Sequence, residues 1–407
     1  MQNSKALKKR NIYLISGIFS MLFSGVLYAW SILKVPFRED FGWTDSALAL
    51  NFTVTMCFFC LGAFFGSLLN RKAGVKITLI TAGVLVGAGF ILTGLLTENM
   101  LPALYITYGF LAATGIGISY NVTVSTVNAW FPDKKGLSSG LLMMGFGVST
   151  LILGNIISTL FESEAAGVTK TYILLGSVTA LVIIASAFIL KKPAEDTVLP
   201  RAGITKSNKA ESFEAVEFTP LQMIKSFTFI RAFICMAFIT AVGNSVISFA
   251  RDLMLSVDAA PSLATTLVGV LSVFNGVGRI LTGILFDKAG RKITMLSANI
   301  LTIIAAGITL LAVITSSLPL CIAGLCLTGI SYGSCPTVTS AFTMAFYGKK
   351  SFATNYSIMN FNLIFASFFA TFSSTLLTNT GSYVAPFVML LILSVLALGL
   401  NFSIRKP

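Results

Sequence analysis

The chain is built mainly from apolar segments of about 20 residues, separated by short polar stretches. A helix of that length crosses the ~30 Å hydrocarbon core of a bilayer, and inside lipid it satisfies its own backbone N–H and C=O groups. Hydrophobic residues make up 55% of the 407 and charged residues only 11%, whereas soluble domains carry about 25% charged residues. The sequence therefore predicts an all-α membrane protein that crosses the bilayer many times.

Twelve transmembrane helices are expected in two groups of six. The predicted spans are 12–35, 46–69, 75–97, 101–128, 137–160, 171–190, 227–250, 263–286, 292–314, 318–346, 352–377 and 382–403. The first run is longer than the apolar part of a signal peptide and no small-residue cleavage site follows it, so it is taken as a helix. The expected organisation is an N-terminal half at 1–190, a largely flexible cytosolic linker at 191–226 and a C-terminal half at 227–407.

The formal charge of +13 reflects the topology of the chain. Most Lys and Arg residues fall in the two termini and in the loops on one side of the predicted membrane; the exceptions are Lys34, Arg38, Lys170, Arg251 and Arg279. Such a bias is typical of loops that face the cytoplasm. It predicts a multi-pass protein of the cell inner (cytoplasmic) membrane with both termini in the cytoplasm, and it disfavours nucleic acid as a partner.

Two short motifs recur in the two halves. Gly66–Lys76 is similar to Gly283–Lys292 at an offset of 217 residues, and Gly117-Ile-Ser-Tyr120 recurs as Gly329-Ile-Ser-Tyr332 at an offset of 212. Repeats at nearly equal offsets indicate two pseudo-symmetric halves. In such carriers the substrate site lies at the interface of the repeats, near the middle of the membrane.

One arginine lies inside an otherwise uncharged apolar stretch. Arg279 is the only charged residue in Leu271–Phe286, and an unpaired guanidinium at that depth costs roughly 3 to 10 kcal/mol. No Asp, Glu or His lies in the middle of any predicted span. The expected counter-ion is therefore an anionic ligand, and Asn275, four residues earlier, lies on the same helical face.

Further candidate ligands are polar residues within the predicted spans: Tyr28, Tyr120, Tyr332, Lys34, Asn360 and Asn362. A buried phenol needs a hydrogen-bond partner, which a carboxylate would supply; packing or an interfacial belt is the alternative for each tyrosine. Lys34 is either a second cation for the anion or a side chain that extends to the headgroups. The two asparagines either contact substrate or bond neighbouring helices.

Nothing in the sequence favours catalysis. The chain has no histidine, and its six cysteines are scattered, with Cys57 and Cys60 inside an apolar helix. No Gly-Lys-Ser/Thr motif for a nucleotide is present. The expectation is a protein that is not an enzyme, uses no cofactor or metal, and draws its energy from a gradient.

Several segments carry a resemblance to a known family. Gly283-x-x-x-Asp287-Lys288-x-Gly290-Arg291 resembles the loop hallmark of the major facilitator superfamily. More narrowly, Gly25–Ser31, Trp130-Phe-Pro-Asp-Lys-Lys-Gly136 and Asn275-Gly-Val-Gly-Arg279 are similar to the oxalate/formate antiporter group, which in turn is similar to the monocarboxylate transporters. The resemblance covers essentially the whole chain and implies the major facilitator fold.

The same resemblance implies a carrier of small carboxylates that alternates access by rocking its halves. It places the substrate-binding arginine at Arg279 and cavity-lining aromatic residues at Tyr28, Tyr120 and Tyr332. It also implies a gating role for the loop carboxylate, here Asp287 with Lys288 and Arg291.

Three positions depart from the family pattern. Leu363 stands where the oxalate exchangers have a lysine, which disfavours a dianion such as oxalate. Asn275 stands where proton-coupled monocarboxylate carriers have an aspartate, so that pair cannot couple to protons. Asn70 replaces the loop carboxylate of the first half, which leaves gating to Asp287.

The sequence therefore predicts a secondary active transporter of small organic anions. The expected substrates are monocarboxylates such as lactate, pyruvate or formate, with oxalate at the edge of the class. Its expected partners are the carboxylate, the lipid bilayer and either a counter-anion, for exchange, or a proton. Two alternatives stay open: an efflux carrier of drugs or amphiphiles, and a non-transporting membrane sensor that signals through 191–226.

Overall fold

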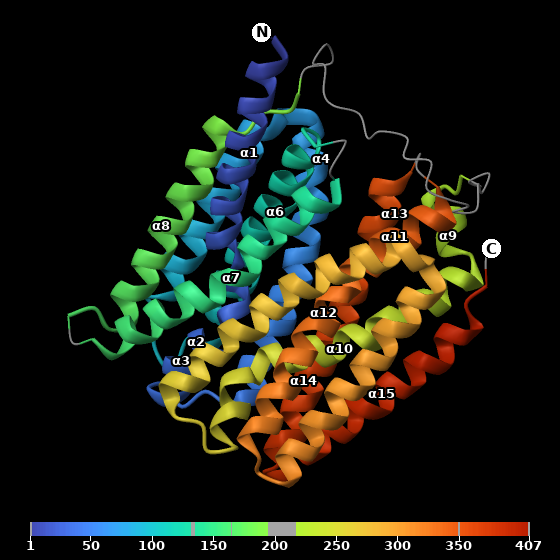
Figure 1. The fold of residues 1–407 in the computed structure, drawn as a ribbon. Helices are drawn as coiled ribbons and strands as arrows, with labels where there is room; N and C mark the ends of the chain where they lie inside the picture. The colour runs from blue at the N-terminus through green and yellow to red at the C-terminus, as the bar shows by residue number, and fades with distance from the viewer. Residues whose placement is uncertain (1, 132–134, 164, 194–216, 349–350, 406–407) are drawn as a thin grey trace. The chain divides into compact units, whose positions relative to one another are not determined.

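The computed structural model describes residues 2–131, 135–163, 165–193, 217–348 and 351–405, and the regular structure in these ranges is helical throughout (Figure 1). Eleven helices in this part of the chain are long and apolar enough to cross a membrane. One of them, α4 (Asp45–Thr93), has 49 residues and is divided by Gly74, whose φ of 79° and ψ of 172° are not helical. Counting its two parts separately accounts for the twelve expected spans, so the predicted all-α architecture is confirmed.

The chain divides into two compact units. The first unit contains Met1–Thr44 and Val54–Ser207, and the second contains Asp45–Thr53 and Asn208–Pro407. This division differs from the expected halves in one respect, because the first nine residues of α4 belong to the second unit. The boundaries 1–190, 191–226 and 227–407 remain predictions.

In the first unit, α1 (Gln2–Ser24) contacts α6 (Ala113–Asn128), α7 (Lys135–Glu162) and α8 (Gly167–Ile189). The first predicted span is not one regular helix. After α1 come a 3-10 segment η1 (Gly25–Ala29), α2 (Trp30–Leu33) and α3 (Val35–Glu39). Before α6 come α5 (Leu101–Leu104) and a π-helical segment η2 (Tyr105–Ala112). Such irregular turns often mark functional positions in a helix.

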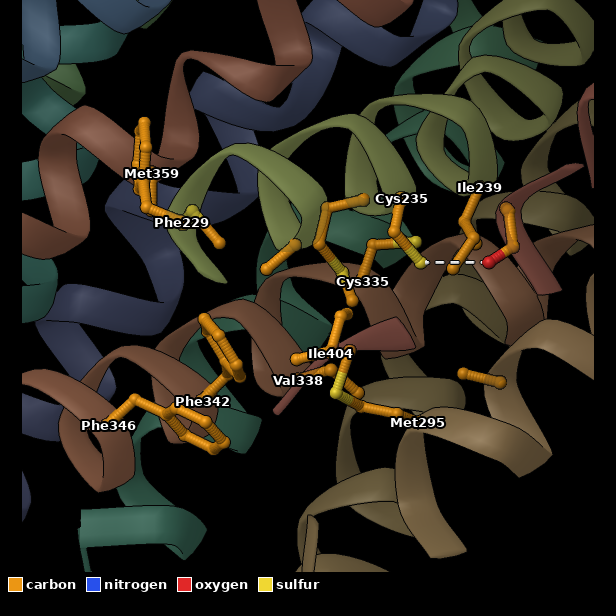
Figure 2. Close-up of a cluster of buried hydrophobic side chains, with 14 of the residues drawn as sticks. Phe229, Cys235, Ile239, Met295, Cys335, Val338, Phe342, Phe346, Met359 and Ile404 are labelled. Carbon is orange, nitrogen blue, oxygen red and sulfur yellow. Dashed lines mark hydrogen bonds between the residues drawn. The ribbon is translucent and has the colours of Figure 1, made fainter. Parts of the chain in front are cut away.

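In the second unit, α10 (Phe227–Leu255) contacts α11 (Pro261–Ile314), α12 (Leu318–Tyr347), α14 (Asn362–Thr380) and α15 (Val384–Ser403). Figure 2 shows a cluster of buried apolar side chains in this unit, including Phe229, Met295 and Phe342, with Cys235 donating a weak hydrogen bond to the Ala397 carbonyl at 3.3 Å. The cluster gives the second unit an apolar core of its own.

The start of α4 is hydrogen-bonded to α14 within the second unit. Thr53 Oγ1 donates to the Ser367 carbonyl at 2.5 Å and lies 2.7 Å from Thr371 Oγ1. Thr371 Oγ1 also lies 3.2 Å from the Ala49 carbonyl oxygen, which it bonds as donor. These contacts explain why Asp45–Thr53 belongs to this unit and not to the unit that contains the rest of α4.

The described end of the predicted linker is structured. The short helix α9 (Pro220–Ile224) begins with a capping box between Thr219 and Gln222. The backbone N–H of Phe218 donates to the Tyr347 carbonyl at 3.1 Å, and its own carbonyl accepts from Asn355 Nδ2 at 3.1 Å. The expectation of a flexible linker is therefore wrong for 217–226, because this segment docks on α12 and α13 (Phe352–Asn360). Residues 194–216 lie outside the described ranges.

The two units repeat the same helix contacts. A Cβ added at Gly66 would touch Ile118, and one added at Gly278 would collide with Ile330. Likewise Gly117 packs against the Phe59 carbonyl and Gly329 against the Leu271 carbonyl. Both pairs of contacts are related by an offset of 212 residues, so the internal repeat expected from the sequence is present in the packing.

The structure corrects the register of one repeated motif. Gly66 corresponds to Gly278 in the packing, not to Gly283 as the offset of 217 suggests. The kinks at Gly74 (φ 79°) and Gly290 (φ 72°) correspond in turn. The distance along the chain from packing glycine to kink glycine is thus eight residues in the first unit and twelve in the second. The second unit has about one extra helical turn here.

Candidate functional site

Helices α11 and α12 pack closely against each other (Figure 1). Arg279 lies on α11. A side chain at Gly278 would collide with the Ile330 carbonyl, and one at Gly333 would collide with the Asn275 carbonyl. Small residues at such crossings let two backbones approach and fix the helices against each other. The glycines of Asn275-Gly-Val-Gly-Arg279 and Gly329–Gly333 therefore hold the backbone of Arg279 in a defined place.

The guanidinium of Arg279 is buried and bonded to a neutral side chain. Arg279 is 7% exposed, and its Nε donates to Asn275 Oδ1 at 3.3 Å. The predicted i, i+4 pairing of these two residues is thus present. Thr337 Oγ1 of α12 donates a hydrogen bond to the Arg279 carbonyl at 3.5 Å. The amide orients the planar guanidinium without neutralising its charge.

Buried charge in this protein has one sign. Among the side chains that the structure describes, the charged ones that are buried are Arg10, Lys34 and Arg279, and every described Asp or Glu is at least partly exposed. Arg10 packs its guanidinium over the Phe131 ring at 3.9 Å. Buried guanidinium and ammonium groups are costly to desolvate, and they favour an anion that comes close to them.

Tyr28 and Tyr120 come together in the first unit. Tyr28 lies on η1 and Tyr120 on α6, and both contact the Phe146 ring edge-to-face, with centroids 5.1 and 5.4 Å away. Tyr120 also meets the Phe59 ring at 5.4 Å. Sequence reasoning missed Phe146 as the centre of this aromatic cluster, because a phenylalanine within an apolar span carries no signal of its own.

Tyr332 has a partner within its own unit. Its hydroxyl donates to Asn244 Oδ1 at 2.7 Å, and Asn244 Nδ2 donates in turn to Ser367 Oγ at 2.9 Å. A phenol has a single hydroxyl proton, and in Tyr332 this proton is donated to Asn244. In this arrangement Tyr332 connects α12 to α10 and α14, and its role as a substrate ligand remains a prediction.

Tyr332→Phe is therefore expected to lower stability more than substrate affinity. The change leaves the buried Oδ1 of Asn244 without its donor, at a cost of about 1–3 kcal/mol. We expect a lower melting temperature of the purified protein and a transport KM within about twofold of wild type, since less than ~0.5 kcal/mol of binding is at stake. A large rise in KM at unchanged melting temperature would assign Tyr332 to the substrate instead.

Lys34 is buried, with 3% of its surface exposed, at the junction of α2 and α3. A lysine that extends to the headgroups would be exposed, so the snorkelling alternative does not describe this side chain. Lys34 is thus a buried cation of the first unit, like Arg10, and its role toward an anion remains a prediction.

Asn360 and Asn362 flank a break in the eleventh predicted span. Phe361 ends α13 and precedes α14. Asn362 is buried; its Nδ2 donates to the Met359 carbonyl at 2.7 Å, and its Oδ1 accepts from Thr240 Oγ1 at 3.4 Å. Asn362 thus bridges the break between α13 and α14 and links it to α10. Asn360 is half-buried.

The gating candidates are only partly described. The side chain of Asp287 lies outside the part of the chain that the structure describes. Lys288 is exposed, and Arg291 stacks its guanidinium on the Phe346 ring at 4.7 Å and lies 3.7 Å from Met295 Sδ. Arg291 is thus held against α12, and the gating role of all three residues remains a prediction.

The Trp-Phe-Pro motif ties together one end of the first unit. Trp130 Nε1 donates to the Lys191 carbonyl at 2.6 Å, which joins the end of α6 to the end of α8. The Trp130 ring lies 4.8 Å from that of Tyr13 on α1. Ser138 Oγ donates to Asn128 Oδ1 at 2.7 Å and links α7 to α6. Residues 132–134 of the motif lie outside the described ranges.

Metal binding has no support in the described part of the chain. No three His, Cys, Asp or Glu side chains within it gather closely enough to hold an ion. Cys57 and Cys60 lie within α4 as half-buried and buried side chains. The site residues that the structure brings into contact are therefore Arg279 with Asn275, and Tyr28 with Tyr120 through Phe146.

A family comparison identifies the chain. The model of the Major Facilitator Superfamily matches residues 12–361 and 232–407. The chain belongs to the Major Facilitator Superfamily. As a member it is a membrane transporter, built from the two repeated units described above.

Curated relatives within the Major Facilitator Superfamily are similar along most of the chain. The oxalate:formate antiporter of Oxalobacter formigenes is 30% identical over 72% of this chain and 67% of its own length. The MFS-type transporter YhjX of Escherichia coli is 25% identical over 88% of this chain and 86% of its own. Monocarboxylate transporter 12 of Mus musculus is 24% identical over 88% and 77%.

Solved structures support the same fold. A bacterial homologue of the human lysosomal transporter Spinster, in an inward-facing and occupied conformation, aligns with a TM-score of 0.70 over 97% of this chain and 96% of that one. The same homologue in an unoccupied conformation also gives 0.70. At 15% and 16% identity these likenesses establish the Major Facilitator fold alone.

Proposed function

We propose that this protein is a secondary transporter of small organic anions, with monocarboxylates such as lactate, pyruvate or formate as its substrate class. The observation that carries the proposal is a buried arginine within an apolar helix, Arg279, whose guanidinium is oriented by the amide of Asn275. The relatives named as an oxalate:formate antiporter and as monocarboxylate transporter 12 support it.

Arg279 supplies the chemistry that recognises a carboxylate. A guanidinium offers parallel N–H donors that match the two oxygens of a carboxylate, and it stays protonated at any physiological pH. Asn275 fixes its plane. Tyr28, Tyr120 and Lys34 of the first unit, and Asn360 of the second, are the further proposed ligands.

Charge neutralisation links binding to movement. With the anion absent, a buried guanidinium keeps a high desolvation cost, and with the anion bound that cost is offset by the ion pair. The loaded carrier therefore rearranges more easily than the empty one. Exchange of one anion for another is the simplest coupling, because the buried charged side chains that the structure describes include no carboxylate to carry a proton. Symport with a proton is the alternative.

The number of cations favours a single negative charge. Arg279 is the one buried charged residue among the described side chains of the second unit, and position 363 is a leucine. One guanidinium on the C-terminal side balances one carboxylate, so a monocarboxylate is the better match there; Lys34, if it also contacts the anion, would add a second positive charge. The basic loops further suggest an inner-membrane protein with cytoplasmic termini.

Reconstituted vesicles test the proposal. Purified protein in liposomes preloaded with a short monocarboxylate is expected to take up the labelled anion saturably, and faster than empty liposomes do. An excess of unlabelled formate, lactate or pyruvate should compete, whereas a lipophilic cation should not. Inhibition by the lipophilic cation alone would indicate an efflux carrier of amphiphiles, and binding of carboxylates without any flux would indicate a sensor.

A further inference from the structure

The first unit contains a cavity that none of the candidate ligands above lines. This cavity of about 500 Å³ opens where the kink of α4 at Gly74 meets the end of α8. Side chains that define its character are those of Asn70, Lys76, Phe188, Lys191 and Lys192.

The lining of this cavity is cationic. Lys76, Lys191 and Lys192 contribute three ammonium groups, and the lining residues within the described ranges include no Asp or Glu. Lys76 Nζ lies 4.5 Å from the centre of the Phe188 ring, which holds one of these charges against the wall. Like charges collected in one concave surface raise the local positive potential and favour an anion there.

Asn70 contributes a buried hydrogen-bond acceptor to this cavity. This residue is 6% exposed, and its Oδ1 has no hydrogen-bond partner within the described ranges. A buried acceptor left unmatched is costly. A bound molecule that carries a hydroxyl group next to its negative charge would satisfy both the amide oxygen and the lysines.

The cavity lies where the membrane surface is expected. The apolar span Gly167–Ile189 ends immediately before Lys191 and Lys192. Below the lysines, Phe188 (58%), Leu181 (68%) and Ile77 (55%) expose their apolar side chains on α8 and α4. A cationic cavity continuous with an exposed apolar helix surface matches a molecule with an anionic head and hydrocarbon tails.

We propose that this cavity binds the headgroup of an anionic phospholipid of the phosphatidylglycerol type. The phosphate lies among the three lysines, the glycerol hydroxyls donate to Asn70 Oδ1, and the acyl chains follow Phe188 and Leu181. The neutral amide at position 70 is part of the site, because an aspartate there would repel the phosphate.

Native mass spectrometry of the detergent-purified full chain tests this proposal. With equal additions of phosphatidylglycerol and phosphatidylcholine, wild type is expected to retain phosphatidylglycerol preferentially. Each lysine near an anionic headgroup contributes about fivefold in affinity, so the Lys76→Gln, Lys191→Gln, Lys192→Gln triple variant should lose this preference, on the order of 100-fold. A matched triple variant of Lys72, Lys225 and Lys292 to Gln, which removes three exposed lysines that do not line the cavity, should keep it.

Asn70→Asp is the second arm, since it changes charge with little change in shape. It should reduce phosphatidylglycerol retention while the protein keeps its melting temperature in phosphatidylcholine. Equal retention by wild type, the cavity triple variant and Asn70→Asp would overturn the proposal. Full displacement of the lipid by millimolar inorganic phosphate would also overturn it, because the site would then be one for a free ion.

Discussion

Replacing Arg279 by alanine is expected to reduce anion uptake to the background of empty liposomes. The guanidinium is buried and is held by Asn275 at 3.3 Å. Removing one partner of a buried, hydrogen-bonded charge pair costs about 2–5 kcal/mol, which is about 30-fold to several-thousand-fold in affinity. The loss should be measured as initial uptake rate in proteoliposomes at fixed protein content.

Folding is expected to survive this substitution. Alanine removes the cost of burying a charge, which offsets the loss of the hydrogen bond to the buried Asn275 Oδ1, so the melting temperature should change little. Arg279→Lys keeps the charge but lacks the planar pair of donors, and it should retain only a small part of the activity. A collapse of the melting temperature in Arg279→Ala would instead make the arginine a structural residue.

Arg251 offers a matched control in the same unit. Its Nε also meets a neutral side chain, Thr265 Oγ1 at 3.4 Å, but it is half-buried near the end of α10. Arg251→Ala should therefore transport at close to the wild-type rate. If both arginine variants lost uptake equally, loss of positive charge in general, and not the Arg279 site, would explain the result.

Gly333→Ala is expected to be the most destabilising conservative change near the site. A Cβ at this position would overlap the Asn275 carbonyl oxygen, a backbone atom that cannot rotate away. Overpacking of this kind typically costs about 1–3 kcal/mol, and more where the backbone cannot shift. The variant should show a lowered melting temperature and a lower yield of folded protein, measured by scanning fluorimetry and size-exclusion chromatography.

Gly307→Ala is the control for that experiment. Gly307 lies within α11, and a Cβ added there meets no atom within 4 Å. Alanine gains up to about 1 kcal/mol over glycine from helix propensity, so this variant should be neutral or slightly stabilised. Equal melting temperatures for the two variants would show that α11 and α12 are not in the close contact described here.

The sequence was enough to predict the helices, because apolar length alone defines a membrane span. It did not predict the irregular stretch from Gly25 to Glu39 or the break at Phe361, since these depend on tertiary packing that has no local signature. The offset of 217 between loop motifs was misleading for the same reason. Only the contacts of Gly66 and Gly278 reveal the extra turn in α11.

The charged part of the candidate site could be predicted from the sequence, whereas the hydrogen bonds of its tyrosines could not. Arg279 and its i, i+4 partner Asn275 follow from composition and helical spacing. Tyr332 was predicted as a ligand of the same kind as Tyr28 and Tyr120, and in the structure its hydroxyl is bonded to Asn244, a residue 88 positions away. No sequence pattern indicates a partner at that separation, so hydrogen bonding of the tyrosines could only be seen in three dimensions.

The bond from Trp130 to the Lys191 carbonyl has a bearing on how genomes are searched. The indole joins two helix ends, and this structural role does not depend on the substrate. A homologue can therefore keep the tryptophan while it transports a different compound. A sequence search based on this tryptophan would collect proteins that share a fold. Grouping the same proteins by the residues at positions 275 and 279 would separate them by substrate class.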